Sequence, residues 1–249
     1  MTKPPLAGLA ALLLVAGCHR PLETRAEHAI TDLLPRYLGK ADSYTARVGG
    51  RPDALLRGHV RTVHIEGINV ALVPNLFVER LDVDIKDVSV DPETLRLQNV
   101  GETRFTARLT ESVINAYVSR RPSTLKKAYV TLGADGKVTV TATPEVLGFT
   151  TLPVSLRGTA HVADGGTRLD FLPDKASVSV GDRTASAGFP AFVADHIASR
   201  LNPVADWRAA PLSVVAETVT VERGAVSITG YIPPGALQKA IADAAQRPN

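Results

Sequence analysis

The sequence predicts an α+β fold, in which mostly antiparallel strands are interrupted by a few short helices. From Tyr44 onward apolar and polar residues alternate with a period of two, which is typical of half-buried strands. Turn-forming residues divide this region into hairpins, at Asp135-Gly136, Gly165-Gly166 and Arg223-Gly224. Helical spacing is confined to a few short segments, so the chain offers few crossover helices. Because parallel strands need crossovers, an antiparallel meander is favoured.

The first predicted element is a helix over residues 22–34, whose apolar residues recur every three or four positions and which Pro35 ends or kinks. Alternation then predicts strands around residues 63–65, 81–90 and 103–109. Within the second of these strands the apolar phase shifts by one residue at Lys86-Asp87. Such a slip would expose the core face of the strand, so we expect a bulge or a break there.

Two more helices are predicted between strands. The first starts at Thr110, a suitable N-cap, places Glu111 near the positive end of its dipole and stops at Pro122. The second starts near Pro190, which a first helical turn tolerates, and ends at Pro203. The remaining strands are predicted over residues 129–132, 138–142, 152–162, 167–172, 212–221 and 225–232, with a weak helix over 237–245.

The first eighteen residues have the features of an export signal. Lys3 supplies a positive charge, residues 6–15 form an apolar run, and Val15-Ala16-Gly17-Cys18 resembles the bacterial lipobox, in which the cysteine is acylated. The run is too short for a bilayer core of ~30 Å, which needs about 20 apolar residues. We predict a signal peptide over 1–17 and fatty acyl chains, such as palmitate, on Cys18. The alternative is an uncleaved anchor, or an ordinary secretory signal followed by a chance cysteine.

This interpretation sets the domain organisation and the location. Residues 18–43 form an N-terminal helix and linker, residues 44–232 one α+β domain, and residues 233–249 a short C-terminal helix and tail. The mature chain is expected in a bacterial cell envelope, on the outer face of the cytoplasmic membrane or the periplasmic face of an outer membrane. His19 does not match the Asp that favours inner-membrane retention in many Gram-negative bacteria.

Composition excludes several functional classes. With 45% apolar and 21% charged residues the chain is globular. Removal of the predicted signal peptide deletes one base and no acid, so the net charge falls from +3 to +2, too small to indicate a nucleic-acid partner. Cys18 is the only cysteine. Once it is acylated, disulfides, thiolate metal sites and cysteine nucleophiles are excluded together.

Catalytic and metal-binding patterns are absent from the sequence, which predicts a non-catalytic protein without a cofactor or a metal. There is no Gly-x-Ser-x-Gly elbow, no His-Glu-x-x-His pair and no phosphate-binding glycine loop. His59 and His64 lie five residues apart on a predicted strand and therefore point to opposite faces. Asp82 and Asp84 alternate with apolar residues, so we interpret them as part of a solvated acidic strand face that discourages aggregation.

Two groups of residues are candidates for ligand binding. The first is the apolar face of the two middle helices, comprising Val113, Ile114, Tyr117, Val118, Phe189, Phe192, Val193, Ile197 and Leu201. These side chains either close the core or line a groove for acyl chains. The second is a basic cluster comprising Arg120, Arg121, Lys126 and Lys127. These bases either lie in a solvated loop or contact anionic lipid headgroups at the membrane.

The order of short motifs resembles a known family, the LmeA-type phospholipid-binding proteins of bacterial envelopes. The matching segments, spread over residues 44–232, are Leu55-Leu56-Arg57-Gly58-His59-Val60, Val63-His64-Ile65-Glu66-Gly67-Ile68, Leu81-Asp82-Val83-Asp84-Ile85, Phe105-Thr106-Ala107-Arg108-Leu109-Thr110-Glu111 with Asn115, Leu169-Asp170-Phe171-Leu172-Pro173 and Val219-Thr220-Val221-Glu222-Arg223-Gly224-Ala225-Val226. The resemblance implies a fold similar to tubular lipid-binding proteins, in which a strongly curved antiparallel sheet wraps around helices and leaves an apolar groove. It implies lipid binding and no motif-defined catalytic residue.

Three functions from different classes follow from these features. The leading hypothesis is a membrane-anchored lipoprotein that binds, and carries or senses, phospholipid or a related envelope lipid. The second is a structural or partner-binding lipoprotein with a filled core and no lipid cargo. The third is an enzyme acting on an envelope lipid or glycan, which would need a buried polar cluster that the sequence spacing does not reveal.

Overall fold

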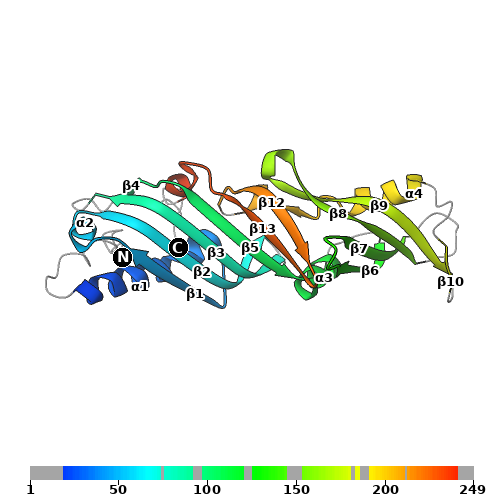
Figure 1. Cartoon of the computed structure of the whole chain (residues 1–249), viewed down its shortest axis with the longest axis horizontal. Coiled ribbons are helices and arrows are strands. Elements are labelled where there is room, and N and C mark those ends of the chain that lie inside the picture. Colours follow the sequence, from blue (N-terminus) through cyan, green and yellow to red (C-terminus); the bar gives the residue numbers. More distant parts are fainter. Residues whose placement is uncertain are drawn as a thin grey trace, which may run out of the picture.

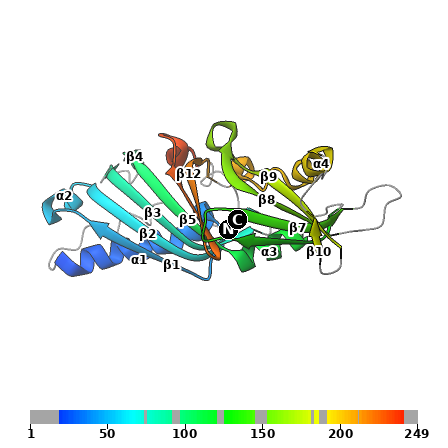
Figure 2. The ribbon, with the colours of Figure 1, turned by 45° about the vertical axis from the view of Figure 1, so that its right-hand side comes forward.

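The computed structural model describes residues 19–73, 76–91, 97–120, 125–144, 153–180, 183–185, 191–210 and 212–240. These residues form two antiparallel sheets that follow one another along an elongated molecule (Figure 1). Helix α1 (His19–Leu38) lies along the first sheet and α4 (Ala191–Leu201) against the second (Figure 2). The predicted α+β class with an antiparallel, curved sheet and few helices is therefore confirmed.

The first sheet has the strand order β1-β2-β3-β5-β13-β12, with β4 paired to β3. Its strands are β1 (Ser43–Gly49), β2 (His59–Val73), β3 (Leu76–Val90), β4 (Leu97–Asn99), β5 (Thr103–Thr110), β12 (Val215–Glu222) and β13 (Ala225–Tyr231). The hairpin of β12 and β13 returns to pair with β5, so segments from the first and the second half of the chain contribute to this sheet. The short helix α2 (Pro52–Leu56) joins β1 to β2 at one end of the molecule (Figure 1).

The second sheet has the order β10-β9-β8-β7-β6, with β11 paired to β9. Its strands are β6 (Leu125–Leu132), β7 (Val138–Pro144), β8 (Val154–Ala163), β9 (Arg168–Val180), β10 (Arg183–Ala185) and β11 (Ala205–Asp206). Helix α3 (Glu111–Arg120) links the two sheets, because it follows β5 directly and its Glu111 carboxylate accepts a hydrogen bond of 2.8 Å from the Leu132 backbone N–H in β6.

Helix α1 continues through Pro35 to Leu38, beyond the end expected from the sequence. It stops at Gly39, whose φ of 106° is a left-handed conformation that glycine adopts without strain. A side chain at this position would also meet the Ala71 carbonyl oxygen at 2.3 Å. The short connection from Gly39 then turns the chain into β1, which pairs with β2.

Strands β2 and β3 run side by side for fifteen residues each, and the face that each presents to the core changes along their length. In β3 the inward residues are Val83 and Ile85, then Val88. The inward face changes at Asp87, which has a φ of 52°. The shift in apolar phase expected at Lys86-Asp87 therefore occurs within one uninterrupted strand. A second change takes place at Asn69 of β2, at a φ of 53°.

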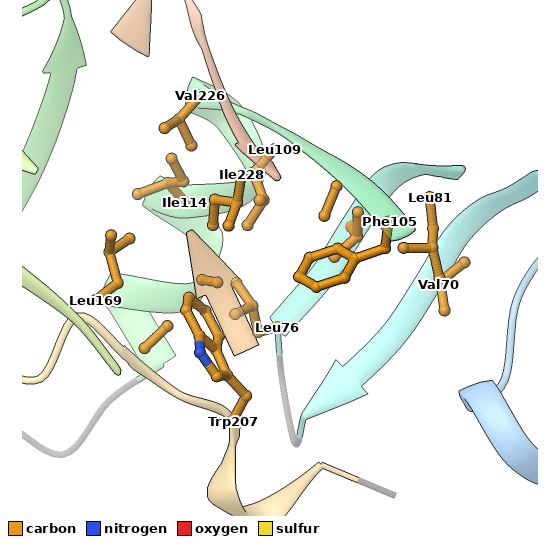
Figure 3. Close-up of a cluster of buried hydrophobic side chains, with 14 of the residues drawn as sticks. Val70, Leu76, Leu81, Phe105, Leu109, Ile114, Leu169, Trp207, Val226 and Ile228 are labelled. Atoms are coloured by element: carbon orange, nitrogen blue, oxygen red, sulfur yellow. The ribbon is translucent and has the colours of Figure 1, made fainter. Parts of the chain in front are cut away.

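The core is continuous from one sheet to the other. Figure 3 shows the junction, where Trp207 points toward the same cluster as Leu109 and Ile228 of the first sheet, and Leu169 of β9 joins it. The indole N–H of Trp207 donates a hydrogen bond of 2.8 Å to the Gly166 carbonyl, so its one polar atom is satisfied although the side chain is buried.

Candidate apolar binding cavity

An apolar cavity of about 230 Å³ lies between α1 and the concave face of the first sheet. Its walls are aliphatic, apart from Tyr37 and from Glu23, which is the one charged residue among the described lining residues. The lining comprises Glu23, Ala26, Ile30, Leu33, Leu34, Tyr37, Leu38, Val48, Leu55, Gly58, Val60, Val63, Ile65, Val83, Ile85, Val88, Val90, Val100, Leu212, Ile232 and Leu237. Such a surface offers dispersion contacts and no fixed polar partners, which suits a hydrocarbon chain.

Helix α1 forms one wall of this cavity because its apolar residues share one face. Ala26, Ile30 and Leu33 are three or four positions apart, which places their side chains in one row along the helix. The face was visible in the sequence as helical spacing. Its role was not, because the sequence does not show that the first sheet curves around this helix.

Two hydrogen bonds link α1 and its C-terminal end to strand β1. Glu27 accepts one of 3.1 Å from the Val48 backbone N–H in β1, and the Tyr44 hydroxyl donates one of 2.9 Å to the Gly39 carbonyl at the end of the helix. Burial raises the pKa of Tyr44 to about 12. The buried side chains of Leu34 and Leu38 add apolar contacts to this attachment.

A second apolar cavity of about 60 Å³ adjoins the first. The two share the wall residues Tyr37, Leu38, Val83, Leu212 and Ile232. The second cavity reaches the junction of the sheets and is lined there by Phe105 and Trp207 (Figure 3). Together the two spaces form an apolar track under α1 that points toward the middle of the molecule.

A third cavity, also of about 60 Å³, lies in the second half of the molecule. Three residues of the predicted apolar faces line it, namely Ile114 and Val118 from α3 and Leu201 from α4. Its wall also includes the buried Asp170, whose Oδ2 accepts a hydrogen bond of 2.8 Å from Arg168, while Oδ1 has no partner among the described residues.

The other predicted apolar residues are placed as follows. Ile197 is 1% exposed and contributes to the core, whereas Val113 and Tyr117 are partly buried and pack against it. Phe189 lies outside the described residues, and α4 carries Phe192 and Val193, whose side chains are outside the described part of the chain. The structure thus brings Ile114, Val118 and Leu201 to one cavity, and the larger cavity is built from α1.

The predicted basic cluster is divided between two elements. Arg120 is exposed at the end of α3, and Lys127 is exposed in β6 at a φ of 52°. Arg121 lies outside the described residues, as does the side chain of Lys126, and residues 1–18, with Cys18, are likewise outside them.

The outer face of the first sheet carries paired charges. Arg80 contacts Asp82 at 3.0 Å and Glu66 at 3.1 Å, and His64 contacts Asp84 at 2.8 Å. This pattern supports the interpretation of Asp82 and Asp84 as a solvated strand face.

Neighbouring charges on this face lower a carboxyl pKa. Hydrogen bonds from Lys86 at 2.8 Å and Arg104 at 2.6 Å hold the pKa of Glu102 at about 2. Among the described residues no three His, Asp or Glu side chains gather in a way that could hold a metal ion. The described helices include none that is long and apolar enough to cross a membrane.

Comparison with known proteins gives one match. Residues 18–231 match a family model described as LmeA-like phospholipid-binding. The matched range contains α1 and every strand from β1 to β13, and so nearly the whole lining of the large cavity. No curated protein and no solved structure matches the chain.

Proposed function

Because the chain belongs to the LmeA-like phospholipid-binding family, we propose that it binds the acyl chains of a phospholipid or related envelope lipid in the cavity under α1, without catalysis. The observation that carries this proposal is the cavity itself, an apolar space of about 230 Å³ between a helix and a curved sheet. Each methylene buried there contributes roughly 0.8 kcal/mol.

The size of the cavity bears on how it would be filled. Pockets for small ligands measure about 300–1,000 Å³, whereas this cavity measures about 230 Å³ and its neighbour about 60 Å³. One acyl chain would occupy the existing track. A lipid with two chains would require α1 to move away from the sheet, so that the apolar face of the helix contacts lipid chains in place of the sheet.

Membrane attachment is the second part of the proposal. The described part of α1 starts at His19, the residue that follows the lipobox cysteine Cys18 in the sequence. Acyl chains on Cys18 would therefore hold the cavity-forming helix at the membrane surface of a bacterial envelope. From there the protein would carry or sense lipid.

The deciding experiment is native mass spectrometry of the purified full-length protein, with two matched tryptophan variants. Ile65→Trp fills the large cavity, and Leu156→Trp overpacks a fully buried position that lines none of the three cavities. We expect bound phospholipid in the parent protein, and its loss from Ile65→Trp with a nearly unchanged melting temperature. Leu156→Trp should lower the melting temperature and keep its lipid. A parent protein free of lipid that still captures a protein partner would instead support the structural lipoprotein.

A further inference from the structure

We propose that the end of the molecule formed by α2 and the start of α1 docks on an anionic membrane surface and turns the cavity under α1 toward the bilayer. This inference rests on the proposed function and adds the surface that contacts the membrane from which the lipid comes. The partner that this surface contacts is a phospholipid bilayer with acidic headgroups.

The placement of α2 is the first step. Figures 1 and 2 show α2 and the first turns of α1 at the same end of the long axis, away from the second sheet. Glu23 of α1 and Leu55 of α2 line the same large cavity. This end of the molecule is therefore the end of the cavity that lies nearest to the chain preceding α1.

The chemistry of α2 is the second step. Leu55 is buried in the cavity, and the next residue, Leu56, is 52% exposed. Exposed Arg57 follows it, and exposed Arg51 lies just before the helix. An exposed leucine between bases combines the two residue types by which amphipathic helices enter the boundary between headgroups and acyl chains.

Two more bases extend this surface onto β2. His59 and Arg61 are exposed and line a shallow polar pocket of about 430 Å³ that also contains Ser89, Asn99 and Asp87. The polar pocket adjoins the apolar cavity, because Val60 and Val88 line both. The polar pocket would thus contact a lipid headgroup, and the adjoining apolar cavity would contact the acyl chains of the same lipid.

In the segment around α2 itself, the bases outnumber the acids. Asp53 contacts Arg51 at 3.2 Å and Arg57 at 3.0 Å, so one carboxylate is shared by two guanidinium groups. All three side chains are more than half exposed and remain available to phosphates. Since the described part of α1 starts one residue after Cys18, an acylated Cys18 would hold this same surface against the membrane.

The test uses the full-length protein in vesicles of phosphatidylcholine and phosphatidylglycerol. Cys18 is the only cysteine, so the acylated parent should take up no thiol label. Leu56→Cys and the matched control Leu172→Cys, which is 48% exposed on β9 of the second sheet, each carry one polarity-sensitive fluorophore. We expect the label at position 56 to shift to the blue and to be quenched by bilayer-embedded quenchers, and the label at position 172 to stay in water.

A pair of charge-reversal variants tests the electrostatic part. Each base near an anionic surface raises the membrane partition coefficient about fivefold. The R57E/R61E variant should therefore lower the bilayer contact of the label at position 56 by about tenfold or more at low salt. The matched control K175E/R223E makes the same charge change at exposed bases of β9 and of the turn between β12 and β13, and should leave the contact unchanged. An equal loss in both variants would overturn the proposal, as would a water-exposed label at position 56.

Lipid occupancy of the same preparations separates this inference from the function on which it rests. Bound phospholipid with position 56 in water would overturn the docking surface and leave lipid binding in place. An empty cavity with position 56 in the bilayer would overturn lipid binding and support docking.

Discussion

Asn115 of α3 and Val130 of β6 exchange two hydrogen bonds, in which the Asn115 amide donates to the Val130 carbonyl at 2.8 Å and accepts from its N–H at 2.7 Å. Asn202, just after α4, makes the same exchange with Phe171 of β9, at 2.9 and 2.7 Å. In each case a side-chain amide takes the place of a neighbouring strand. The amide side chain forms hydrogen bonds with strand N–H and C=O groups that have no partner strand on that side, and it thereby fixes the helix beside the strand.

Loss of the Asn115 amide is expected to destabilise the protein. Asn115→Ala leaves the backbone groups of the buried Val130 without partners, which should lower the free energy of unfolding by about 1–3 kcal/mol. Ser119→Ala on the same helix removes an exposed hydroxyl and should change it by less than about 0.5 kcal/mol. Urea denaturation of the two variants measures the difference. Equal stability would show that water replaces the Asn115 amide.

A matched pair of isoleucines distinguishes the core from the cavity. Ile197 is 1% exposed and lines none of the three apolar cavities, so Ile197→Ala should cost about 2–5 kcal/mol and leave lipid occupancy unchanged. Ile30 faces the large cavity, so Ile30→Ala should cost less stability and alter the bound lipid. Thermal melting and lipid mass spectrometry on both variants give the two readouts. A reversed pattern would move the lipid site to α4.

The raised pKa of Tyr44 predicts a loss of stability in alkali. Tyr44 ionises near pH 10 in the unfolded chain and near 12 in the folded protein, so the folded state holds the proton longer. Its contribution to stability is complete below pH 10 and is lost as the pH rises toward 12. Denaturation of Tyr44→Phe and the parent protein at several pH values should show a shallower decline for the variant. Parallel declines would mean that other tyrosines control the alkaline transition.

Replacement of Cys18 tests the membrane anchor. Cys18→Ser should abolish acylation and lipoprotein-type cleavage, because a hydroxyl does not replace the thiol in the transfer step. Labelling with a palmitate analogue and detergent phase separation follow the change. Persistent labelling and membrane partition of the variant would contradict the lipobox.

Local patterns were enough to predict many elements. The alternation over 103–109 corresponds to β5, and the helix expected from Thr110 corresponds to α3 at Glu111–Arg120. Helix α3 forms within one short segment, and the alternation in β5 reflects its one buried face, although its partner strands β3 and β13 lie further away in the sequence. Pro35 did not end α1, because packing of the helix against β1 and β2 outweighs the one backbone hydrogen bond that proline removes.

The division into two sheets and the cavity under α1 were not predictable. Both depend on how β2 and β3 curve and on which helix their concave face meets, and these are contacts between distant parts of the chain. The helical spacing of Ile30 and Leu33 showed an apolar face without showing what it covers. The apolar faces around Ile114 and Leu201 were expected either to close the core or to line a groove, and the cavity that they line is the smaller one.

The paired face changes of β2 and β3 limit how this part of the protein can evolve in length. At Asn69 of β2 and at Asp87 of β3, both strands change the face that they present to the core. The register between β2 and β3 is the same before and after each of these positions, so the two strands change together. One residue inserted between these points in one strand would reverse its inward and outward side chains, while the partner strand kept its own. Relatives should therefore vary in length at the ends of this ribbon, and a gap inside it should be matched by a gap in the opposite strand.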